Sequence, residues 1–536
     1  PYNADADPTE HEEIWPMIVA SRRNYFFVGE SIDPNDWQPN VTAEQIYQRV
    51  MDGVRHEDGH IILLHDAGGN SRKPTLDALP RIIDSLRRSG YQFITLEQYL
   101  GMDRKTLMPP IEKGKAYYAM RSNLFLAELI YHMSDFLTAL FLVFLGLGTL
   151  RLLFMYVLMV REKRAENRRH YPPIDPATAP LVSIIVPAYN EEVNIVRTIK
   201  TLKQQDYPNM HIYFVDDGSK DHTLERVREA FGDDREVTIL SKPNGGKASA
   251  LNYGVEACIS EYVVCIDADT QLKDDAVSRL MNHFIADKEK RVGAVAGNVK
   301  VGNQRNLLTY WQAIEYTSSQ NFDRMAYSNI NAVTVVPGAI GAFRKTVIQE
   351  VGGFTTDTLA EDCDLTMSIN EHGYIIENEN YAVALTEAPE TLRQFVKQRI
   401  RWSFGVMQAF WKHRSALFAP SKGGFGLWAM PNMLIFQYII PTFSPIADVL
   451  MIIGLFTGNV VQILSYYALF LIIDASVSIM AYIFERERLW VLILVIPQRF
   501  FYRWIMYYVL FKSYLKAIKG ELQTWGVLKR TGNVGK

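Results

Sequence analysis

The segment Tyr262–Asp269, YVVCIDAD, constrains the fold of this chain more than any other stretch. Its first part is a short apolar run rich in β-branched residues, the pattern of a strand buried on both faces. The run ends in Asp267 and Asp269, two carboxylates one residue apart. In an open α/β sheet, ligands bind at the edge where strands end. Solvated turn aspartates would give the same short pattern, so neighbouring segments must decide between the two interpretations.

Two upstream segments repeat this layout. Leu181–Val186 is a second apolar strand candidate, and Ile212–Val215 is a third. Polar residues follow both strands, namely Tyr189, Asn190 and Glu191 after the first and Asp216 and Asp217 after the second. Helix-like stretches accompany these strands, at residues 191–205, 222–231 and 248–259. This alternation predicts a doubly wound parallel sheet with its polar strand ends along one edge.

Two further motifs carry polar and aromatic groups. The segment Leu359–Asp364, LAEDCD, contains Glu361 and Asp362. The segment QRIRW places Gln398, Arg401 and Trp402 at positions i, i+3 and i+4, which share one face of a helix. Acids near a helix start and an amphipathic helix at a membrane surface are the alternative interpretations.

The motifs PAYNE, DDGS, DAD, AED and QRIRW, in this order, resemble those of the inverting family 2 glycosyltransferases. More narrowly, they resemble the processive membrane synthases of cellulose, chitin, hyaluronan and poly-N-acetylglucosamine. The resemblance covers residues 180–536 and implies a GT-A-like, Rossmann-like cytosolic domain with transmembrane and interfacial helices. Ala360 stands where the family often has Thr, and we expect this difference to leave the catalytic base intact.

The resemblance implies a role for each motif. The nucleotide and sugar of a UDP-sugar donor would be held by Tyr189, Asn190, Glu191, Asp216, Asp217, Lys247, Asp267, Gln398 and Arg401. Asp269 would bind the Mg²⁺ or Mn²⁺ that bridges the diphosphate. Asp362 would be the general base that deprotonates the acceptor hydroxyl, with Glu361 orienting it. The acceptor sugar would contact Trp402, Gly338 and Arg344.

Lys247 follows Gly245 and Gly246 at the start of a predicted helix. Backbone N–H groups and an ammonium group there could face the donor phosphates. The two glycines could equally serve as a turn. The segment is not a Walker A loop, because Ser241 stands where that motif begins with glycine.

Residues 1–110 are expected to form a separate soluble piece, with strands at His60–Asp66 and Tyr91–Thr95 and a helix at Thr75–Ser89. The motifs DPNDW and ILLHD resemble the C-terminal part of the NodB-like polysaccharide deacetylases. The resemblance implies that His65 is a general acid and that Trp37 walls a sugar groove. Paired aspartates, which bind metal in that family, do not occur in residues 1–110, so we expect this piece not to deacetylate by itself.

Asn123–Val160 is mostly apolar and reads as one long helix that exceeds a bilayer core of roughly 30 Å. A basic cluster follows, formed by Arg161, Lys163, Arg164, Arg168 and Arg169. The positive-inside rule places this cluster and the transferase in the cytosol and residues 1–110 outside the cell. We expect domains at 1–110, 111–170, 171–412 and 413–536 in a multi-pass protein of the cell membrane.

The last domain should combine interfacial and membrane-crossing helices. Pro441 and Pro445 are expected to divide Phe425–Phe456 into an interfacial helix and a crossing. Val460–Phe484 reads as a second crossing, and Trp490–Val509 as a further interfacial helix because it contains arginines. Gln523–Gly532 resembles the C-terminal loop that closes over the nucleotide in these synthases.

Composition excludes other classes. The chain is 48% hydrophobic yet 21% charged, which suits neither a pure bundle of membrane spans nor a plain soluble enzyme. A net charge of −3 gives no basis for nucleic-acid binding. The three cysteines, Cys258, Cys265 and Cys363, all follow residue 180, so disulfides cannot stabilise the N-terminal region.

We therefore expect a processive β-glycosyltransferase that extends a polysaccharide acceptor, threads it through its own helices and contacts membrane lipid. UDP-N-acetylglucosamine is the expected donor, because the deacetylase-like piece belongs with N-acetylglucosamine polymers. Hyaluronan and cellulose synthesis are the alternatives within the class. Outside it, the chain could be a membrane-anchored deacetylase with a degenerate transferase, or a non-catalytic polysaccharide-binding scaffold.

Overall fold

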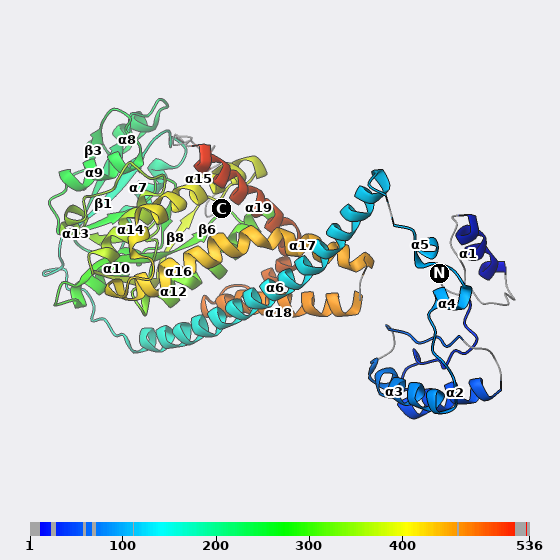
Figure 1. The fold of residues 1–536 in the computed structure, drawn as a ribbon. Coiled ribbons are helices and arrows are strands. Elements are labelled where there is room, and N and C mark those ends of the chain that lie inside the picture. The colour runs from blue at the N-terminus through cyan, green and yellow to red at the C-terminus, as the bar shows by residue number, and fades with distance from the viewer. Residues whose placement is uncertain are drawn as a thin grey trace. The chain divides into compact units, whose positions relative to one another are not determined.

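The computed structural model describes residues 11–22, 28–56, 61–66, 71–110, 112–457, 460–519 and 532. The chain divides into two compact units, Pro1–His132 and Met133–Lys536 (Figure 1). The second unit contains an eight-stranded sheet of order β3-β2-β1-β4-β7-β6-β8-β5.

The first half of the sheet is parallel, as predicted. It consists of β1 (Val182–Ala188), β2 (Met210–Asp216), β3 (Val237–Ser241) and β4 (Tyr262–Cys265). Each strand inferred from an apolar run is present, and α7 (Ile195–Lys203), α8 (Thr223–Phe231) and α9 (Lys247–Ala257) follow β1, β2 and β3. Alternate side chains of β1 enter two different cores: Ile184 packs in one and Ile185 in the other, which confirms burial on both faces.

The second half of the sheet is mixed, so the prediction of a parallel sheet is wrong there. It consists of β5 (Gln271–Leu272), β6 (Val292–Val301), β7 (Gly341–Arg344) and β8 (Ile375–Thr386). Strand β7 runs antiparallel to both β4 and β6. Its first residue, Gly341, is paired with Cys265 at the end of β4. The loop before β7 therefore ends at the same edge of the sheet as Asp267.

Helices cover both faces of the sheet and place the functional motifs (Figure 1). They include α10 (Ala276–Ala286), α11 (Leu307–Glu315), α12 (Phe322–Ser328), α13 (Lys345–Glu350), α14 (Glu361–Glu371) and α15 (Leu392–Lys412). Helix α14 starts with the acids of the LAEDCD motif, and α15 carries QRIRW, as predicted. A π-helical turn, η1 (Tyr316–Asn321), joins α11 to α12.

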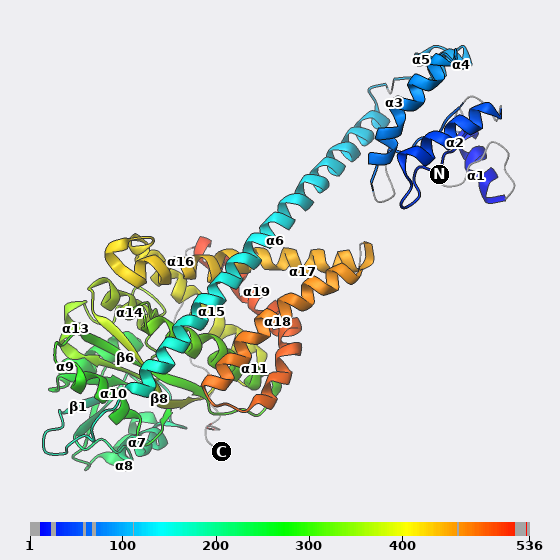
Figure 2. The same ribbon diagram turned by 90° about the horizontal axis from the view of Figure 1, so that it is seen from below.

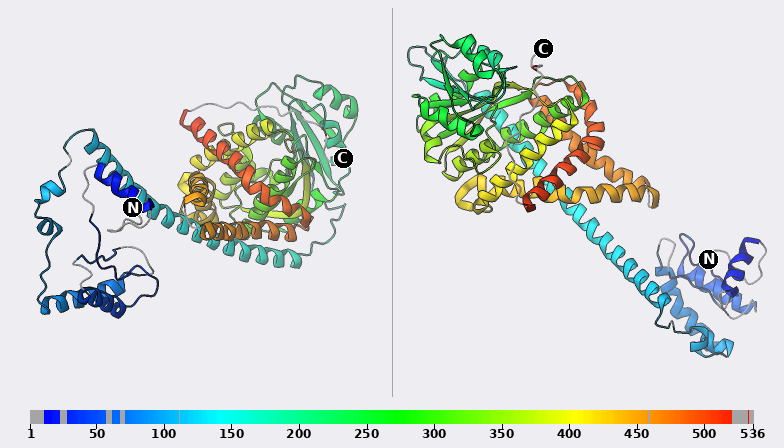
Figure 3. Two further views of the ribbon diagram at one scale, coloured as in Figure 1. Left: turned by 90° about the vertical axis from the view of Figure 1, so that its right-hand side faces the viewer. Right: turned by 90° about the horizontal axis from the view of Figure 1, so that it is seen from above.

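The predicted long apolar helix is confirmed as α6 (Lys115–Arg168), although it begins earlier and ends later than expected. Among the described residues, three helical segments are long and apolar enough to cross a membrane, at Ala139–Arg168, Tyr467–Phe484 and Leu489–Lys519. The second lies in α18 (Val460–Phe484), and the third includes α19 (Val495–Lys519) (Figures 2 and 3). The interfacial helix predicted at Trp490–Val509 thus lies in a segment that has the length and composition of a span.

Prolines do not divide the segment after residue 425, contrary to expectation. Helical structure continues from η4 (Phe425–Ala429) through α16 (Met430–Asn432) and η5 (Met433–Ile439) into α17 (Ile440–Thr457). Pro445 lies inside α17. The preceding π-turns change the hydrogen-bond pattern of the helix, which can accommodate groups that proline leaves unpaired.

Part of the basic cluster at the end of α6 contacts the sheet. Arg169 forms ion pairs with Glu162 at 3.0 Å and with Glu377 of β8 at 3.5 Å. Lys163 Nζ donates to the Tyr381 hydroxyl of β8 at 3.0 Å. These two side chains therefore join the end of the long helix to the sheet.

The first unit is small. Helices α2 (Ala43–Arg55) and α3 (Lys73–Arg88) share a core that contains Ile46 and Ile82, and α3 confirms the helix predicted at Thr75–Ser89. The remaining helices are α1 (His11–Arg22), α4 (Leu96–Leu100) and α5 (Arg104–Leu107).

The two strands predicted in the first unit are not found among its described residues. The segment 61–66 forms one isolated bridge between Ile62 and Ile32, and 91–95 has no strand structure. His60, the first residue of one predicted strand, lies outside the described residues. A single extended segment gains little without a neighbouring strand to pair with, so an apolar pattern alone does not create a sheet.

Candidate active site

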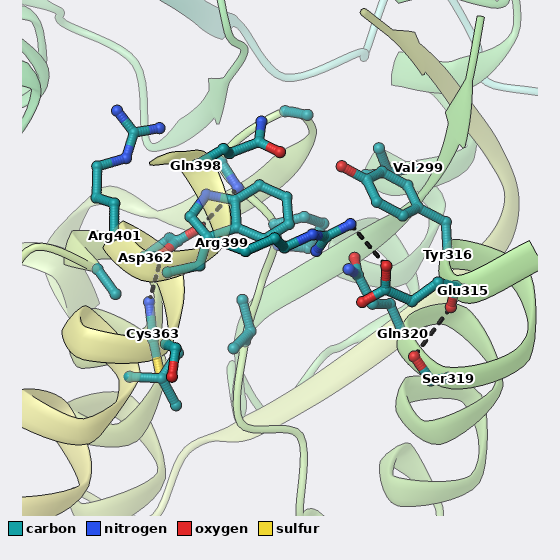
Figure 4. Close-up of a pocket in the computed structure, with 18 of the residues that line it drawn as sticks. Val299, Glu315, Tyr316, Ser319, Gln320, Asp362, Cys363, Gln398, Arg399 and Arg401 are labelled. Carbon is teal, nitrogen blue, oxygen red and sulfur yellow. Dashed lines mark hydrogen bonds and ion pairs between the residues drawn. The ribbon is translucent and has the colours of Figure 1, made fainter. Parts of the chain in front are cut away.

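A cavity of about 790 Å³ lies at the edge of the sheet where β1 and β4 end. Of the predicted site residues, it is lined by Tyr189, Glu191, Lys247, Asp267, Asp269, Gly338, Glu361, Asp362, Gln398, Arg401 and Trp402. Figure 4 shows Asp362 and Cys363 on one side of it and Glu315, Ser319 and Gln320 on the other. The cavity also reaches Arg151 of α6, Tyr438 of η5 and Arg503 of α19. It is thus bounded by the sheet at one end and by helices that include candidate spans at the other.

Asp362 lies in the first turn of α14, where the backbone N–H groups of the turn have no hydrogen-bond acceptor within the helix. Its Oδ1 accepts from Cys363 N–H at 2.8 Å, and its Oδ2 accepts from Gly338 N–H at 3.3 Å. Burial and the neighbouring Glu361 carboxylate raise the pKa of Asp362 to about 6. The carboxylate is thereby oriented and is more basic than an ordinary aspartate.

Lys247 connects the acids of two different elements. Its Nζ lies 2.6 Å from Asp267 Oδ1 and 3.0 Å from Glu361 Oε1. Burial opposes its charge, but the surrounding carboxylates outweigh that effect and raise the pKa of Lys247. A Cβ on Gly338 would lie 2.5 Å from Lys247 Nζ, so a larger residue there would force the ammonium group to shift. In this structure Lys247 contacts carboxylates, and its contact with the donor phosphates stays a prediction.

Asp217 lies beside the cavity rather than in its lining, and it binds the glycine loop. Its carboxylate accepts from Gly245 N–H at 3.0 Å and from Gly246 N–H at 2.8 Å, and it pairs with Lys242 at 2.7 Å. These two backbone N–H groups therefore point to Asp217 and not into the cavity. This differs from the phosphate-binding arrangement suggested by the sequence. Gly246 has a φ of +86°, a conformation that glycine adopts without strain. We infer that Asp217 positions the loop that carries Lys247.

The neighbouring polar residues Asp216 and Asn190 also hold turns. Asp216 accepts from Ser219 N–H at 3.2 Å and from the Ser241 hydroxyl at 3.2 Å. Asn190 Oδ1 accepts from Lys220 N–H at 2.7 Å. Neither residue lines the cavity, so both support the strand-end turns from behind.

Gln398, Arg401 and Trp402 of the QRIRW helix all line the cavity, as their spacing predicted. Gln398 is 7% exposed, and its Oε1 has no hydrogen-bond partner in the part of the chain that the structure describes. Arg401 and Trp402 complete this face. Arg399, which the sequence analysis passed over, lies 4.5 Å from the centre of the Trp402 ring. It forms an ion pair with Glu315 at 2.7 Å, shown in Figure 4, and so holds Trp402 from one side.

Arg344 does not reach the cavity, contrary to its expected role in acceptor binding. It is 3% exposed and pairs with Glu261 at 2.6 Å and with Asp287 at 3.4 Å. Strand β7 runs antiparallel to β4, so Arg344 is paired with Tyr262, at the opposite end of β4 from Asp267. Its role in this structure is to join strand ends on the far edge of the sheet.

Asp269 is the residue expected to bind a divalent cation, and it fits that role. It lines the cavity next to Asp267 and is 4% exposed. Carboxylate oxygens are the donors that Mg²⁺ and Mn²⁺ prefer. The donor set at this edge is therefore consistent with a divalent cation.

A separate carboxylate and histidine group lies in the first unit, where ligand atoms of Asp33, Asp36 and His65 come within 4.8 Å of one another. His65 Nδ1 lies 2.7 Å from Asp36 Oδ1. Asp36 is 1% exposed and also accepts from the Thr75 hydroxyl at 2.8 Å. The arrangement fixes the His65 ring at the end of the ILLHD motif.

Sequence reasoning missed a polar cluster between α6, α12 and α16. Arg151 Nη2 lies 2.8 Å from Asp323, and Arg151 Nε donates to Asn432 at 2.7 Å. Asn432 Nδ2 donates to the Tyr327 hydroxyl at 2.7 Å. Arg151 could have indicated this cluster in the sequence, because an arginine within an apolar helix needs a polar partner.

Comparisons with known proteins agree with this geometry. Residues 183–352 match the sequence profile of glycosyl transferase family 2. A poly-beta-1,6-N-acetyl-D-glucosamine synthase of Staphylococcus epidermidis is 32% identical over 235 residues, which are 43% of this chain and 56% of that protein. The synthase of Staphylococcus aureus strain COL is 31% identical over 224 residues, 42% of this chain and 54% of that protein. The chain thus spans little more than half the length of these relatives.

Among solved structures, the mannosyltransferase PcManGT from Pyrobaculum calidifontis, in complex with GDP-Man and Mn²⁺, has a TM-score of 0.48 and 22% identity. The match covers 70% of this chain and 99% of that one. The sequence match over residues 183–352 and the order of strands and helices together give a GT-A-like, Rossmann-type fold. Residues 183–352 are thus similar to the glycosyltransferase domains of family 2.

Proposed function

We propose that this chain is a hexosyltransferase that extends a polysaccharide from a UDP-sugar, with inversion at the anomeric carbon. The observation that carries the proposal is the group formed by Asp267, Glu361, Asp362 and Lys247 in one cavity of a family 2 domain. Acids from one strand end and one helix start meet there around one ammonium group. A solvated turn or a simple helix start would not bring them together.

Asp362 acts as the general base. Its two N–H donors hold the carboxylate in place, and its pKa of about 6 leaves it ionised yet basic at neutral pH. It takes the proton from the acceptor hydroxyl as that oxygen attacks the anomeric carbon. Inversion by one displacement requires no covalent intermediate, in keeping with the buried Cys363 thiol, whose pKa burial raises well above its ordinary value.

Asp269, with Asp267 beside it, would hold Mg²⁺ or Mn²⁺. The cation supplies Lewis-acid stabilisation of the leaving diphosphate when it is bound. Tyr189, Glu191, Gln398 and Arg401 line the same end of the site and would bind the nucleotide and diphosphate. Asp216, Asp217 and Asn190 would act indirectly, by holding the turns from which these groups project.

The acceptor would occupy the part of the cavity near Trp402 and Gly338 and leave toward the membrane helices. Continuity of the cavity from Asp362 to residues of α6, η5 and α19 supports this path. The relatives named as poly-beta-1,6-N-acetyl-D-glucosamine synthases favour UDP-N-acetylglucosamine as the donor and a β-linked product. Translocation through the candidate spans of a multi-pass membrane protein would follow each addition.

The test is to incubate the purified chain with a panel of UDP-sugars and Mg²⁺ or Mn²⁺, measuring UDP release and polymer length. We expect release and polymer with UDP-N-acetylglucosamine. Polymer from UDP-glucose alone would indicate cellulose-type synthesis, and dependence on UDP-glucuronate would indicate hyaluronan-type synthesis. Absence of UDP release with every donor would refute the transferase proposal and leave the scaffold hypothesis.

For residues 1–110 we propose a deacetylase-like piece outside the membrane. The observation that favours it is the hydrogen bond between His65 and Asp36, which orients the ring as a general acid requires. Trp37 is 45% exposed, as expected for the wall of a sugar groove. Acetate release from N-acetylglucosamine oligomers should be undetectable with this chain, whereas Trp37→Ala should weaken oligomer binding. Unchanged binding would remove the groove assignment.

A further inference from the structure

Arg324 is a buried cation of the cavity that the proposed mechanism does not use. It lies in α12, is 7% exposed and lines the cavity. Its Nη2 donates to Asn321 Oδ1, but its Nε–H has no hydrogen-bond partner among the described residues. None of the described carboxylates forms an ion pair with it, although Asp323 beside it in sequence pairs with Arg151. A buried guanidinium with an unused donor is costly unless a ligand completes it.

The fold fixes the Arg324 side chain in this position. The π-helical turn η1 precedes α12, and such turns often re-aim side chains at functional sites. Asn321, the last residue of η1, is itself anchored, because its Nδ2 donates to the Val299 carbonyl of β6 at 3.1 Å. The guanidinium is thus held through Asn321 by the sheet. Burial lowers the pKa of Arg324 to about 10, which leaves it charged at neutral pH.

The position of α12 indicates which substrate Arg324 meets. Asp323 and Tyr327, from the same helix, bind Arg151 of α6 and Asn432 of α16, so α12 borders the membrane-helix end of the cavity. The leaving diphosphate belongs at the other end, with Asp269 at the end of β4. In an inverting displacement the acceptor approaches from the side opposite the leaving group. A hydrogen-bond donor on α12, such as Arg324, therefore faces the acceptor saccharide.

We propose that Arg324 is an acceptor-binding residue, whose Nε–H donates to an uncharged oxygen of the acceptor saccharide, a hydroxyl or an acetamide carbonyl. This inference rests on the proposed transferase function and extends it to the acceptor chain behind the attacking sugar. A charged donor to a neutral acceptor gives a stronger hydrogen bond than two neutral groups. It would hold the chain end while leaving the diphosphate contacts unchanged.

The test compares the parent with R324Q and R324K. R324Q removes the charge, and R324K keeps a charge but has no Nε–H. R279Q is the matched control, because Arg279 lies on α10, pairs with Asp275 at 2.6 Å and does not line the cavity. For each protein we would measure UDP affinity, UDP release without acceptor, and transfer to oligomers of N-acetylglucosamine and of glucose.

We expect R324Q and R324K to lose transfer to subsaturating acceptor by about tenfold to a hundredfold. UDP affinity and acceptor-free UDP release should stay within about twofold of the parent, and R279Q should match the parent throughout. A loss with both oligomers would identify a hydroxyl as the bound oxygen, and a loss with N-acetylglucosamine oligomers alone would identify the acetamide carbonyl.

Three results would overturn the proposal. UDP affinity that falls in parallel with transfer would assign Arg324 to the donor, and unchanged transfer in both variants would remove it from binding. Loss of folding in both, seen as a lost thermal transition, would make Arg324 structural. Failure of the parent to release UDP from any UDP-sugar would instead refute the transferase function itself, so the two failures are distinguishable.

Discussion

Replacing Lys247 with methionine should shift the pH dependence of transfer, because the ammonium group lowers the pKa of the proposed base. A Cβ on Gly338 would lie 2.5 Å from Lys247 Nζ and 3.5 Å from Asp362 Oδ2, so these two atoms are at most about 6 Å apart. At that distance and an effective dielectric constant of about 20, a unit charge contributes about 3 kcal/mol. This corresponds to a pKa change of about two.

The direction of the shift in the pH profile depends on which protonation state of Asp362 is active. The base must be ionised, so kcat/KM of the parent should rise with pH through a midpoint near 6, the pKa of Asp362. Without the ammonium group, the ionised carboxylate is less stable and the midpoint moves up. Water that enters the site screens part of the effect, and we therefore expect a rise of about one to two pH units.

The assay is the pH profile of UDP-sugar transfer at saturating donor, measured for Lys247→Met and for Lys242→Met as the matched control. Lys242 also pairs with an aspartate, Asp217, at 2.7 Å, but it does not line the cavity. The control should keep the parent midpoint. An unchanged midpoint in a folded, active Lys247→Met variant would refute the argument, and so would an equal shift in both variants.

Four further predictions follow from the site. Asp362→Asn should abolish transfer by at least about a hundredfold while UDP affinity stays near that of the parent; substantial polymer synthesis would place the base elsewhere. Asp269→Ala should weaken UDP binding in Mg²⁺ and remove metal dependence; activity in EDTA equal to that of the parent in Mg²⁺ would exclude the metal role. Trp402→Ala should lower polymer yield more than UDP release, and parallel losses of both would show that the ring supports the donor site or the fold. The pKa of His413 is raised to about 9, because Asp364 and Glu371 outweigh burial. The stability that the protonated ring adds to the fold is therefore complete below about pH 6.5 and is lost as pH rises through about 9. The melting temperature should fall over that range in the parent and not in His413→Gln.

The strand ends could be predicted from sequence because they depend on local pattern. Apolar runs of β-branched residues gave β1, β2 and β4, and the polar residues that follow them necessarily lie at one edge of a parallel sheet. The i, i+3, i+4 spacing likewise gave the cavity face of α15. In both cases the chain neighbours alone determine which groups point the same way.

Contacts between distant segments could not be predicted in this way. Whether Asp217 faces a nucleotide or the amides of Gly245 and Gly246 depends on where a loop 28 residues later returns to the sheet. The expected position of Arg344 at the cavity was wrong for a related reason. Its place in the motif fits either end of β7, and only the antiparallel pairing with β4 determines which end it occupies. The strand-end pattern specifies an edge but not the partner across it.

The membrane-side half of the cavity is joined to the sheet by charges, which bears on how a polymer could leave it. Lys300 of β6 pairs with Glu487 at 2.6 Å and with Glu485 at 3.1 Å, directly after α18. A shift at the end of α18 must therefore move β6 or break two ion pairs, each partly shielded from water. Because Asn321 is anchored to the same strand, such a movement would also reach Arg324. An exit path that opened by separating α18 from the sheet would thus disturb the acceptor end of the site through β6, whereas an exchange of the side-chain partners of Arg151 would leave β6 in place. Exit by exchange of the Arg151 partners requires only that polymer hydroxyl groups replace hydrogen bonds of the Arg151 cluster. The catalytic acids then stay in place.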